Sequence, residues 1–550
     1  MKKYLLLLGA VLCSLHSQTS YNVSLYGHLD LYGQGNSAIS YSEIWGWTDT
    51  VKNREYAIIG TPGGTSIVDI TDSVLKEVSF QIGPPFSANY HEFRTYKNYL
   101  YVGAEGTDPT KRPGIQIIDL SPLPDSTTFK RTFVWDNIYF RAHTVSIEKN
   151  FLYVNGGDFG GTRIMDISDP LSPVQVGSYG KGSTPYVHDS FIKNDTLYAA
   201  AIYAGRTDIV DLTVKGNYTE ATAAKIISKT PTVPEGSTHQ VWLSEDGNYM
   251  FVSTETPGGH LHIYDIRNRT APVEIAAWSS SPTESIHNSF VKGDFLYIAY
   301  YKEGLRVLDI KDPHTPIEVG FYDTYPQNQI DPDIPYRGAW GAYPYFPSGK
   351  IAVSDMNTGL YVFTFNKKYG GRVTGNVRDA ITNAPINNVQ VTVEETGRTF
   401  STDATGRYTY GTAEGLHTIR FYKEGYAEKI DAFTTRAGML DTLNIFLQHG
   451  VVNVNNSDEN VSPKGFYLSQ NYPNPFNPLT SISFSVEEKS FVNLSVYNLL
   501  GEKVATIVDQ NLEKGKHTAN FNAQQLSSGI YFYRLTAGSY TAVKRMTVLK

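Results

Sequence analysis

The chain has 550 residues, too many for a single hydrophobic core, so several domains are expected. Aromatic residues make up 13% and charged residues only 18%, with 39 Tyr and 47 Gly, a composition typical of all-β structure. The net charge of −7 argues against nucleic acid as a partner, because phosphate binding needs a basic surface.

Residues 1–20 have the form of a signal peptide. Two lysines precede an apolar stretch from Tyr4 to Leu15, which is too short to span a bilayer and is followed by small polar residues. The only cysteine, Cys13, lies in this segment, so the mature chain is expected to have neither disulfides nor thiol chemistry. An exported, cysteine-free protein of this size favours a bacterial source. No later stretch is apolar enough for a transmembrane span.

A histidine motif recurs between residues 89 and 291. Each copy has a histidine, then a polar residue, then a mostly apolar run, as in "STHQVWL" and "SIHNSFV". Successive copies are 52, 45, 51 and 48 residues apart, and this regular spacing indicates a repeat fold. The five histidines are His91, His143, His188, His239 and His287.

A second motif, an apolar run that ends in aspartate, occurs six times, as in "SIVDI" and "RVLDI". A further strand-like run lies between each histidine and the next aspartate, and a fourth run follows the aspartate. Four short strands per repeat of this length predict the blades of a β-propeller. The aspartates are expected to cap the turns that follow them. They are Asp69, Asp119, Asp166, Asp211, Asp265 and Asp309.

Two divergent repeats complete the set. The first has Trp47 near the expected histidine position, and the last has Trp340 near that position and Thr364 in place of the aspartate. The last repeat lacks a fourth strand, which the segment 22–31 could supply. We therefore expect residues 21–366 to form a seven-bladed β-propeller whose first strand completes the last blade, which also protects the sheet edge.

Several long motifs resemble the choice-of-anchor B family, whose propeller carries LVIVD repeats. They include "STHQVWLSEDGNYMF", "HNSFVKGDFLYIAYYKEGLRVLDI" and "GAWGAYPYFPSGKIAVSDMNTGLYVF", and "SEIWGWTD" looks like the family's N-terminal signature. The resemblance covers residues 22 to about 366 and implies a secreted or surface protein, without implying an activity or catalytic residues. One departure is "NYHEFRT", where a motif containing Trp is expected in place of His91.

Two small β domains are expected after the propeller. Residues 370–448, with "GGRVTGNVRDAITNAPINNVQVTV", read as a β-sandwich and resemble carboxypeptidase regulatory-like domains, which are accessory modules without an active site. Residues 449–463 are polar and read as a linker.

Residues 464–550 resemble the type A C-terminal sorting domain of type IX secretion cargo, with "NYPNPFNP" and "GIYFYRLTAG" in the matching order. This resemblance implies the type IX secretion machinery as a partner and a Bacteroidota-type source. The protein would then be secreted or attached to the outer-membrane surface of a Gram-negative bacterium.

The first strand of a propeller blade is innermost, so the five histidines are expected at one mouth of the central channel. Each has a polar neighbour, and the neighbours are Glu92, Thr144, Asp189, Gln240 and Asn288. One interpretation is a ligand site that could hold a divalent metal, since imidazole is a common metal ligand. The other is that the imidazoles bridge blades by hydrogen bonds, which repetition in five blades favours. The neighbours differ between blades and are the better candidates for specificity.

His260 and His262 lie two residues apart and share one strand face, where they could join a metal site, although such a pair on an exposed strand is more often without one. The sequence shows no metal-protease, serine-hydrolase or phosphate-loop motif. The leading hypothesis is a secreted or cell-surface propeller that binds an extracellular ligand without catalysis. The alternative is a metal-assisted hydrolase or lyase at the channel mouth, and a third class is an adhesion protein that uses the outer blade faces.

Overall fold

The computed structural model describes residues 20–33, 39–83, 87–106, 114–133, 141–181, 185–219, 225–325, 336–394, 398–449, 466–471, 473–474, 476–498, 501–538 and 540–548. The expected signal peptide, except Ser20, and the expected linker, except His449, lie outside these residues. The chain divides into two compact units, Met1–Lys367 and Lys368–Lys550.

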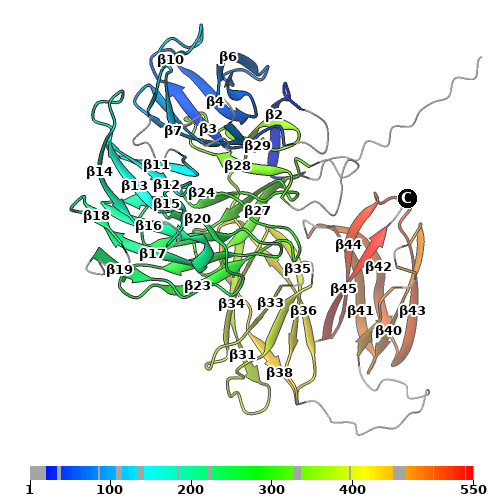
Figure 1. The fold of residues 1–550 in the computed structure, drawn as a ribbon. Coiled ribbons are helices and arrows are strands. Elements are labelled where there is room, and N and C mark those ends of the chain that lie inside the picture. The colour runs from blue at the N-terminus through cyan, green and yellow to red at the C-terminus, as the bar shows by residue number, and fades with distance from the viewer. Residues whose placement is uncertain are drawn as a thin grey trace, which may run out of the picture. The chain divides into compact units, whose positions relative to one another are not determined.

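The described residues of the first unit form seven sheets, each built mainly from strands that follow one another in the chain (Figure 1). The first three contain β3 (Ile44–Asp49), β4 (Arg54–Thr61), β5 (Gly64–Asp69) and β6 (Lys76–Ile82); β7 (Ser87–Tyr96), β8 (Tyr99–Gly106), β9 (Ile115–Asp119) and β10 (Thr128–Phe133); and β11 (Thr144–Glu148), β12 (Phe151–Asn155), β13 (Thr162–Asp166) and β14 (Val174–Tyr179), with β18 (Asn217–Tyr218) added. The fourth and fifth contain β15 (Val187–Lys193), β16 (Thr196–Ala201), β17 (Arg206–Asp211) and β19 (Ile226–Lys229); and β20 (Thr238–Leu243), β21 (Tyr249–Thr254), β22 (Leu261–Asp265) and β23 (Val273–Trp278). The sixth and seventh contain β24 (Ser289–Lys292), β25 (Phe295–Ala299), β26 (Leu305–Asp309) and β27 (Ile317–Tyr322); and β28 (Ala339–Tyr343), β29 (Ile351–Asp355) and β30 (Gly359–Phe365). A short 3₁₀ helix, η1, covers Ile202–Ala204.

The N-terminal strands close the first unit into a ring. Strand β2 (Val23–Leu29) pairs antiparallel with β30, from Val23 opposite Phe365 to Leu29 opposite Leu360, and so supplies the missing strand of the last sheet. Strand β1 (Ser20–Tyr21) pairs with β27 of the sheet before it. The first strands contact one another in the cyclic order β3, β7, β11, β15, β20, β24, β28 and back to β3. The expected closure by the first strand is therefore present.

Apolar clusters between neighbouring sheets hold the ring together. One cluster joins Tyr41, Ile44 and Ile59 of the first sheet region to Leu360 and Val362 of the last, and all five side chains are buried. Since each sheet is covered on both faces, its middle strands are apolar without alternation. This explains why strands such as β16, with the sequence TLYAAA, are buried at every position.

The six repeated aspartates cap turns, as predicted. Each accepts a hydrogen bond on its side chain from the backbone N–H two residues later, with distances of 2.8 to 3.0 Å. The donors are the N–H groups of Thr71, Ser121, Ser168, Thr213, Arg267 and Lys311. These aspartates therefore belong to the architecture of the repeat.

Among its described residues, the second unit contains two separate hydrophobic clusters. The first lies within two sheets formed by β31 (Gly371–Asp379), β34 (Arg407–Thr412), β37 (Leu440–Thr442) and β38 (Ile445–Leu447), and by β32 (Gln390–Val393), β33 (Arg398–Ser401), β35 (Gly415–Tyr422) and β36 (Lys429–Thr435). The second lies within β39 (Tyr467–Leu468), β40 (Leu479–Val486) and β43 (Gly515–Asn522), and β41 (Ser490–Tyr497), β42 (Lys503–Leu512), β44 (Gly529–Ala537) and β45 (Tyr540–Val548).

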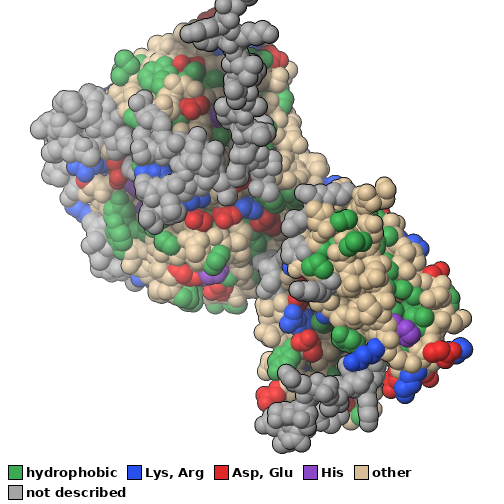
Figure 2. Space-filling model, turned by 90° about the vertical axis from the view of Figure 1, so that its right-hand side faces the viewer, with side chains coloured by type: hydrophobic (Ala, Val, Ile, Leu, Met, Phe, Trp, Pro, Cys, Tyr) green, Lys and Arg blue, Asp and Glu red, His purple; other side chains and the backbone are tan. Residues whose placement is uncertain are grey.

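The all-β fold class predicted from the sequence is confirmed. In the described part of the chain, no helix has the length and apolar character needed to cross a membrane. On the face drawn in Figure 2, acidic and basic side chains of the described residues are interspersed, so that this face has no extended basic surface among them.

Candidate functional site

β-Bulges aim two consecutive side chains of a first strand at the central channel. In the pairing of β15 with β16, Val187 lies opposite Ala201 and Asp189 opposite Ala200, so His188 is the extra residue. The same shift occurs at His239 in β20. Successive side chains of a regular strand point to opposite faces, and a bulge breaks this alternation. The histidine and the polar residue after it can therefore both line the channel.

The strand register defines two layers of channel residues. The imidazole tier consists of His143, His188, His239 and His287, with Trp340 at the same position of β28. The polar tier consists of the residue after the histidine position, or after its structural equivalent, in each of the first six sheets: Glu43, Glu92, Thr144, Asp189, Gln240 and Asn288.

In the first sheet the expected position of Trp47 is wrong. Backbone hydrogen bonds place Ser42 and Glu43 opposite Gly60, in the way that His287 and Asn288 lie opposite Ala299. Ser42 therefore occupies the histidine position, and Glu43 belongs to the polar tier. Trp47 instead stacks on a tyrosine of β4 and donates its indole N–H to a backbone carbonyl of the second sheet.

The tiers enclose a cavity of about 210 Å³. Nine of the ten site residues predicted from the sequence line it: Glu92, His143, Thr144, His188, Asp189, His239, Gln240, His287 and Asn288. Six further residues line it that sequence reasoning did not propose as site residues: Glu43, Arg94, Glu105, Glu255, Phe290 and Trp340.

His91 is the predicted site residue that does not line the cavity. It pairs regularly with Ala104, followed by Glu92 with Gly103, because the irregularity in β7 comes before His91 instead of at it. Regular alternation turns His91 away from the channel when Glu92 faces it. The ring is buried, stacks on Phe93, and has no hydrogen-bond partner for either nitrogen among the described residues. Burial lowers the pKa of His91 to about 4, so the ring is neutral.

The imidazole tier bridges neighbouring sheets. Consecutive ring centroids are 4.0 Å apart for His143 and His188, 4.2 Å for His188 and His239, and 4.4 Å for His239 and His287. His188 Nδ1 lies 3.2 Å from the carbonyl of His239, and His287 Nδ1 lies 2.5 Å from that of Trp340. A carbonyl only accepts, so each Nδ1 is the donor and each Nε2 keeps its lone pair. These bonds support the structural role considered for the histidines.

Burial keeps three of these histidines neutral. It lowers the pKa of His188 well below its usual value and the pKa values of His239 and His287 to about 3. His143 differs because its Nδ1 lies 3.1 Å from Glu105 Oε1. Burial opposes the charged form, but the hydrogen bond and the charge of Glu105 outweigh it and raise the pKa of His143. His143 Nε2 lies 2.5 Å from His188 Nε2.

Buried carboxyl groups dominate the polar tier. Burial raises the pKa of Glu43 to about 7, raises that of Asp189, and raises that of Glu92 well above its usual value. The neighbouring carboxylate of Glu43 raises the pKa of Glu92 further, and Arg94 acts in the opposite direction. Asn288 Nδ2 donates to Glu43 Oε2 at 2.9 Å.

Gly341 of the last sheet makes room for Glu43. A Cβ atom at this position would lie 2.8 Å from Glu43 Oε1, closer than side chains pack. The last blade therefore contributes no side chain to the polar tier, and Asn288 reaches Glu43 from the sixth sheet.

Glu105 and Glu255 share one register position at the ends of second strands. Glu92 pairs with Gly103, and Gln240 pairs with Ser253, so each glutamate lies two residues beyond the partner of a polar-tier residue. This common offset is the sequence signal that could have found both. Glu255 Oε2 lies 3.5 Å from His239 Nε2, and Glu255 Oε1 accepts a 2.5 Å hydrogen bond from the hydroxyl of Tyr301.

His260 and His262 lie outside the cavity lining. Both contact Glu235, at 2.6 Å for His260 Nδ1 and 3.2 Å for His262 Nε2, and His262 Nδ1 also contacts Glu274 at 2.8 Å. His262 is buried, contrary to the exposed pair expected from the sequence. Each of the two ring nitrogens of His262 therefore contacts a carboxylate.

A closed ring of four-stranded sheets around a central channel is a β-propeller. Family models identify its repeats and the domains that follow. The LVIVD repeat matches residues 141–180, 235–278 and 288–324; the carboxypeptidase regulatory-like domain matches residues 372–448; and the secretion system C-terminal sorting domain matches residues 470–549.

The chain is thus an LVIVD-repeat propeller protein with a carboxypeptidase regulatory-like domain and a C-terminal sorting domain, as the resemblances implied. The sorting domain indicates handling by type IX secretion and a location outside the cell or on the outer-membrane surface. Membership of the choice-of-anchor B family stays a prediction.

Similar solved structures include other propellers. The β-propeller domain of Cps50 (Swd1) from Myceliophteria thermophila is 11% identical, with 62% of this chain and 100% of that chain covered and a TM-score of 0.39. A protein from Lactobacillus plantarum is 13% identical, with coverage of 74% and 100% and a TM-score of 0.42. The C-terminal WD40 domain of Sif2 is 10% identical, with coverage of 61% and 99% and a TM-score of 0.41. At such low values the likeness says nothing about activity. No curated protein matches the chain.

Proposed function

We propose that this protein is a secreted or surface-attached propeller that binds a small polar ligand in the channel cavity without altering it chemically. The observation that carries the proposal is the imbalance of the cavity wall, in which five carboxyl side chains face one guanidinium, that of Arg94. The carboxyl side chains are Glu43, Glu92, Glu105, Asp189 and Glu255. Such a wall offers many hydrogen-bond acceptors and suits a ligand rich in donors, such as an amine or a sugar.

The size of the cavity restricts the ligand. A volume of about 210 Å³ lies below the range of roughly 300–1,000 Å³ of pockets for drug-sized ligands. One sugar ring or one amino acid is therefore a better match than an oligomer. Phe290 and Trp340 add apolar surface beside the acceptors, a combination typical of ligand pockets.

The other domains fit delivery of such a binding module. In this proposal residues 1–20 are a signal peptide that is removed, and the carboxypeptidase regulatory-like domain is a spacer or a second contact surface. The sorting domain then brings the propeller to the cell exterior, where small extracellular molecules can reach the channel.

The test is a calorimetric titration of the mature full chain with a panel of monosaccharides, amino acids and short diamines. We expect a member of the panel to bind, and Glu92→Gln and Asp189→Asn each to weaken its binding. The control is Asp72→Asn, which changes an exposed turn residue of the first sheet and should leave binding unchanged. The proposal fails if no member binds, or if both cavity variants bind as tightly as the wild type.

A second candidate function is a metal-assisted hydrolase or lyase. One specific observation favours it: His188, His239 and Glu255 could together hold a metal ion at the cavity. In that case the cavity would hold a substrate next to the ion. Turnover of simple esters or amides by the metal-loaded chain, lost in Glu255→Gln, would support this candidate over the binding function.

A further inference from the structure

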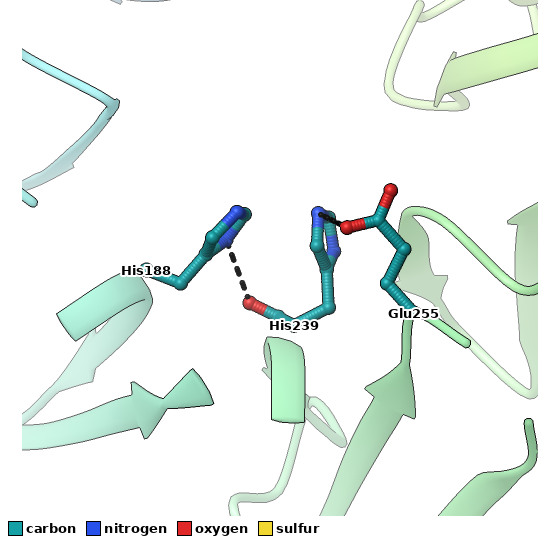
Figure 3. Close-up of side chains that lie close together, drawn as sticks. All are labelled: His188, His239 and Glu255. Carbon is teal, nitrogen blue, oxygen red and sulfur yellow. Dashed lines mark hydrogen bonds and ion pairs between the residues drawn. The ribbon is translucent and has the colours of Figure 1, made fainter. Parts of the chain in front are cut away.

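We infer that His188, His239 and Glu255 form a binding site for one divalent transition-metal ion of the zinc type. One ligand atom from each residue lies within 4.8 Å of the other two. Figure 3 shows the two imidazoles and the carboxylate facing one another from neighbouring blades. The inference concerns the metal alone and holds whether or not the channel binds a further ligand.

The spacing of two of the ligand atoms suits a shared ion. His239 Nε2 and Glu255 Oε2 are 3.5 Å apart, beyond the usual length of a hydrogen bond between such groups. Zinc lies about 2.0–2.2 Å from nitrogen and oxygen ligands, so two ligands of one tetrahedral ion are about 3.4 Å apart. An ion between these two atoms therefore needs almost no rearrangement of the side chains.

Outer contacts orient two of the three ligands, His188 and Glu255, in the manner of known metal sites, whereas His239 Nδ1 has no hydrogen-bond partner among the described residues. His188 Nδ1 donates to the carbonyl of His239, so its Nε2 carries the lone pair, which now faces His143 Nε2 at 2.5 Å and is free for an ion once His143 moves away. The hydroxyl of Tyr301 donates to Glu255 Oε1 and holds the other carboxylate oxygen towards His239. Ligating histidines usually donate their second nitrogen to a carbonyl or carboxylate, and ligating carboxylates are themselves hydrogen-bonded.

His143 lies next to this site. Its Nδ1 contacts the Glu105 carboxylate at 3.1 Å, and its Nε2 is 2.5 Å from His188 Nε2. The two Nε2 atoms are thus closer than two ligands of one ion, which are about 3.4 Å apart. Binding of an ion at His188 would displace His143 Nε2, which could then add a fourth ligand to the same ion or leave that position to water.

The donor set selects the class of metal. Two imidazoles and one carboxylate suit zinc, copper(II), nickel or cobalt(II), whereas calcium and magnesium prefer oxygen ligands alone. Three protein ligands leave a position open towards the cavity, as in zinc sites that bind water or a substrate.

The test uses the mature full chain, stripped with a chelator and then equilibrated with zinc chloride alone. We expect one zinc per chain by elemental analysis, and cobalt(II) in its place should give the visible absorption of a tetrahedral nitrogen and oxygen site. Glu255→Gln, which keeps the size of the side chain, should weaken zinc binding by about tenfold or more. His239→Ala should remove the cobalt spectrum.

The matched control is His260→Ala, which removes a partly exposed histidine that contacts a glutamate outside the cavity. Tryptophan fluorescence of each variant reports whether the ring is folded. The inference is overturned if the wild type holds less than one zinc per chain, if Glu255→Gln binds zinc as tightly as the wild type, or if His260→Ala is the variant that loses the metal. None of these outcomes changes the titration of Glu92→Gln and Asp189→Asn, which tests the channel ligand separately.

Discussion

The substitution Lys350→Met tests how much a buried ammonium group that joins the last sheet of the ring to the first contributes to stability. The Lys350 side chain is only 10% exposed, and its ammonium donates to the carbonyls of Ile70 and Thr71, each at 2.9 Å, and lies 3.4 Å from Glu55 Oε2. Lys350 belongs to the last sheet region and its partners to the first. The contacts of Lys350 therefore join the first and last sheets, between which the ring closes.

Methionine keeps the length of the side chain but removes its charge and donors. Two carbonyls lose a charged donor, and Glu55 keeps only the hydrogen bonds from the backbone and hydroxyl of Ser348, at 2.8 and 2.6 Å. Removing one partner of a buried ion pair costs about 3–5 kcal/mol. Because Ser348 still compensates Glu55, we expect the lower end, a loss of about 3 kcal/mol in the free energy of unfolding.

The assay is urea unfolding of the mature full chain, followed by tryptophan fluorescence. All six tryptophans lie between residues 45 and 340, so the signal reports the ring and not the two C-terminal domains. The double variant Glu55→Gln, Lys350→Met should lose less than the sum of the two single variants, because it leaves no unpaired charge. Lys76→Met, at an exposed position of β6, is the control. Strict additivity, or a loss under about 0.5 kcal/mol for Lys350→Met, would refute the reasoning.

Three further predictions concern the channel and the tail. Burial raises the pKa of Glu43 from 4.5 to about 7. Between these pH values the folded chain keeps a proton that the unfolded chain has lost, so the ring should lose stability as the pH rises from about 4.5 to about 7. Glu43→Gln removes the contribution of Glu43, while the raised pKa values of Glu92 and Asp189 continue to act in the same direction. The stability of Glu43→Gln relative to wild type should therefore grow by on the order of 3 kcal/mol between about pH 5 and about pH 8 in the same urea assay; an unchanged difference contradicts it. His91→Leu removes two buried nitrogens that have no partner among the described residues, and it should raise the unfolding free energy by about 1 kcal/mol. His91→Ala should instead lower the unfolding free energy by leaving a cavity; a loss of stability with leucine would show that the imidazole is needed. Deletion of residues 464–550 should leave the ring folded but retain it in the periplasm of a type IX secreting host, as cell fractionation would show; continued surface display contradicts it.

The repeat frame could be predicted from the sequence because it depends on local chemistry that recurs. The aspartate that ends "SIVDI" or "RVLDI" caps its own turn, and its contacts lie two residues away. Closure by β2 could also be predicted. In the sequence the last repeat has only three strands, and the N-terminal strand belongs to no repeat of its own, so the two complete each other.

The channel wall was predicted in part, because its side chains depend on strand register. His91 has the same local motif as His188, but the position of a bulge decides which way each ring points. The prediction that Trp47 occupies the histidine position was wrong for the same reason. Counted from the histidine position to its partner on the second strand, the first hairpin of this sheet is longer than in the other repeats, so the residue at that position is Ser42. Glu105 and Glu255 lie at the ends of second strands, outside the histidine motif, and Glu105 reaches His143 only because neighbouring sheets pack together.

The pairing of β2 with β30 also determines when the ring can close during synthesis of the chain. Val23 is among the first residues of the ring to be synthesised, yet its partner Phe365 is among the last. An N-terminal fragment that lacks β30 therefore cannot form the final sheet of the ring. The nascent chain stays open until the whole ring sequence exists, and a product that stops before Leu360 keeps an unpaired strand edge, a feature that exposes incomplete chains to aggregation or degradation.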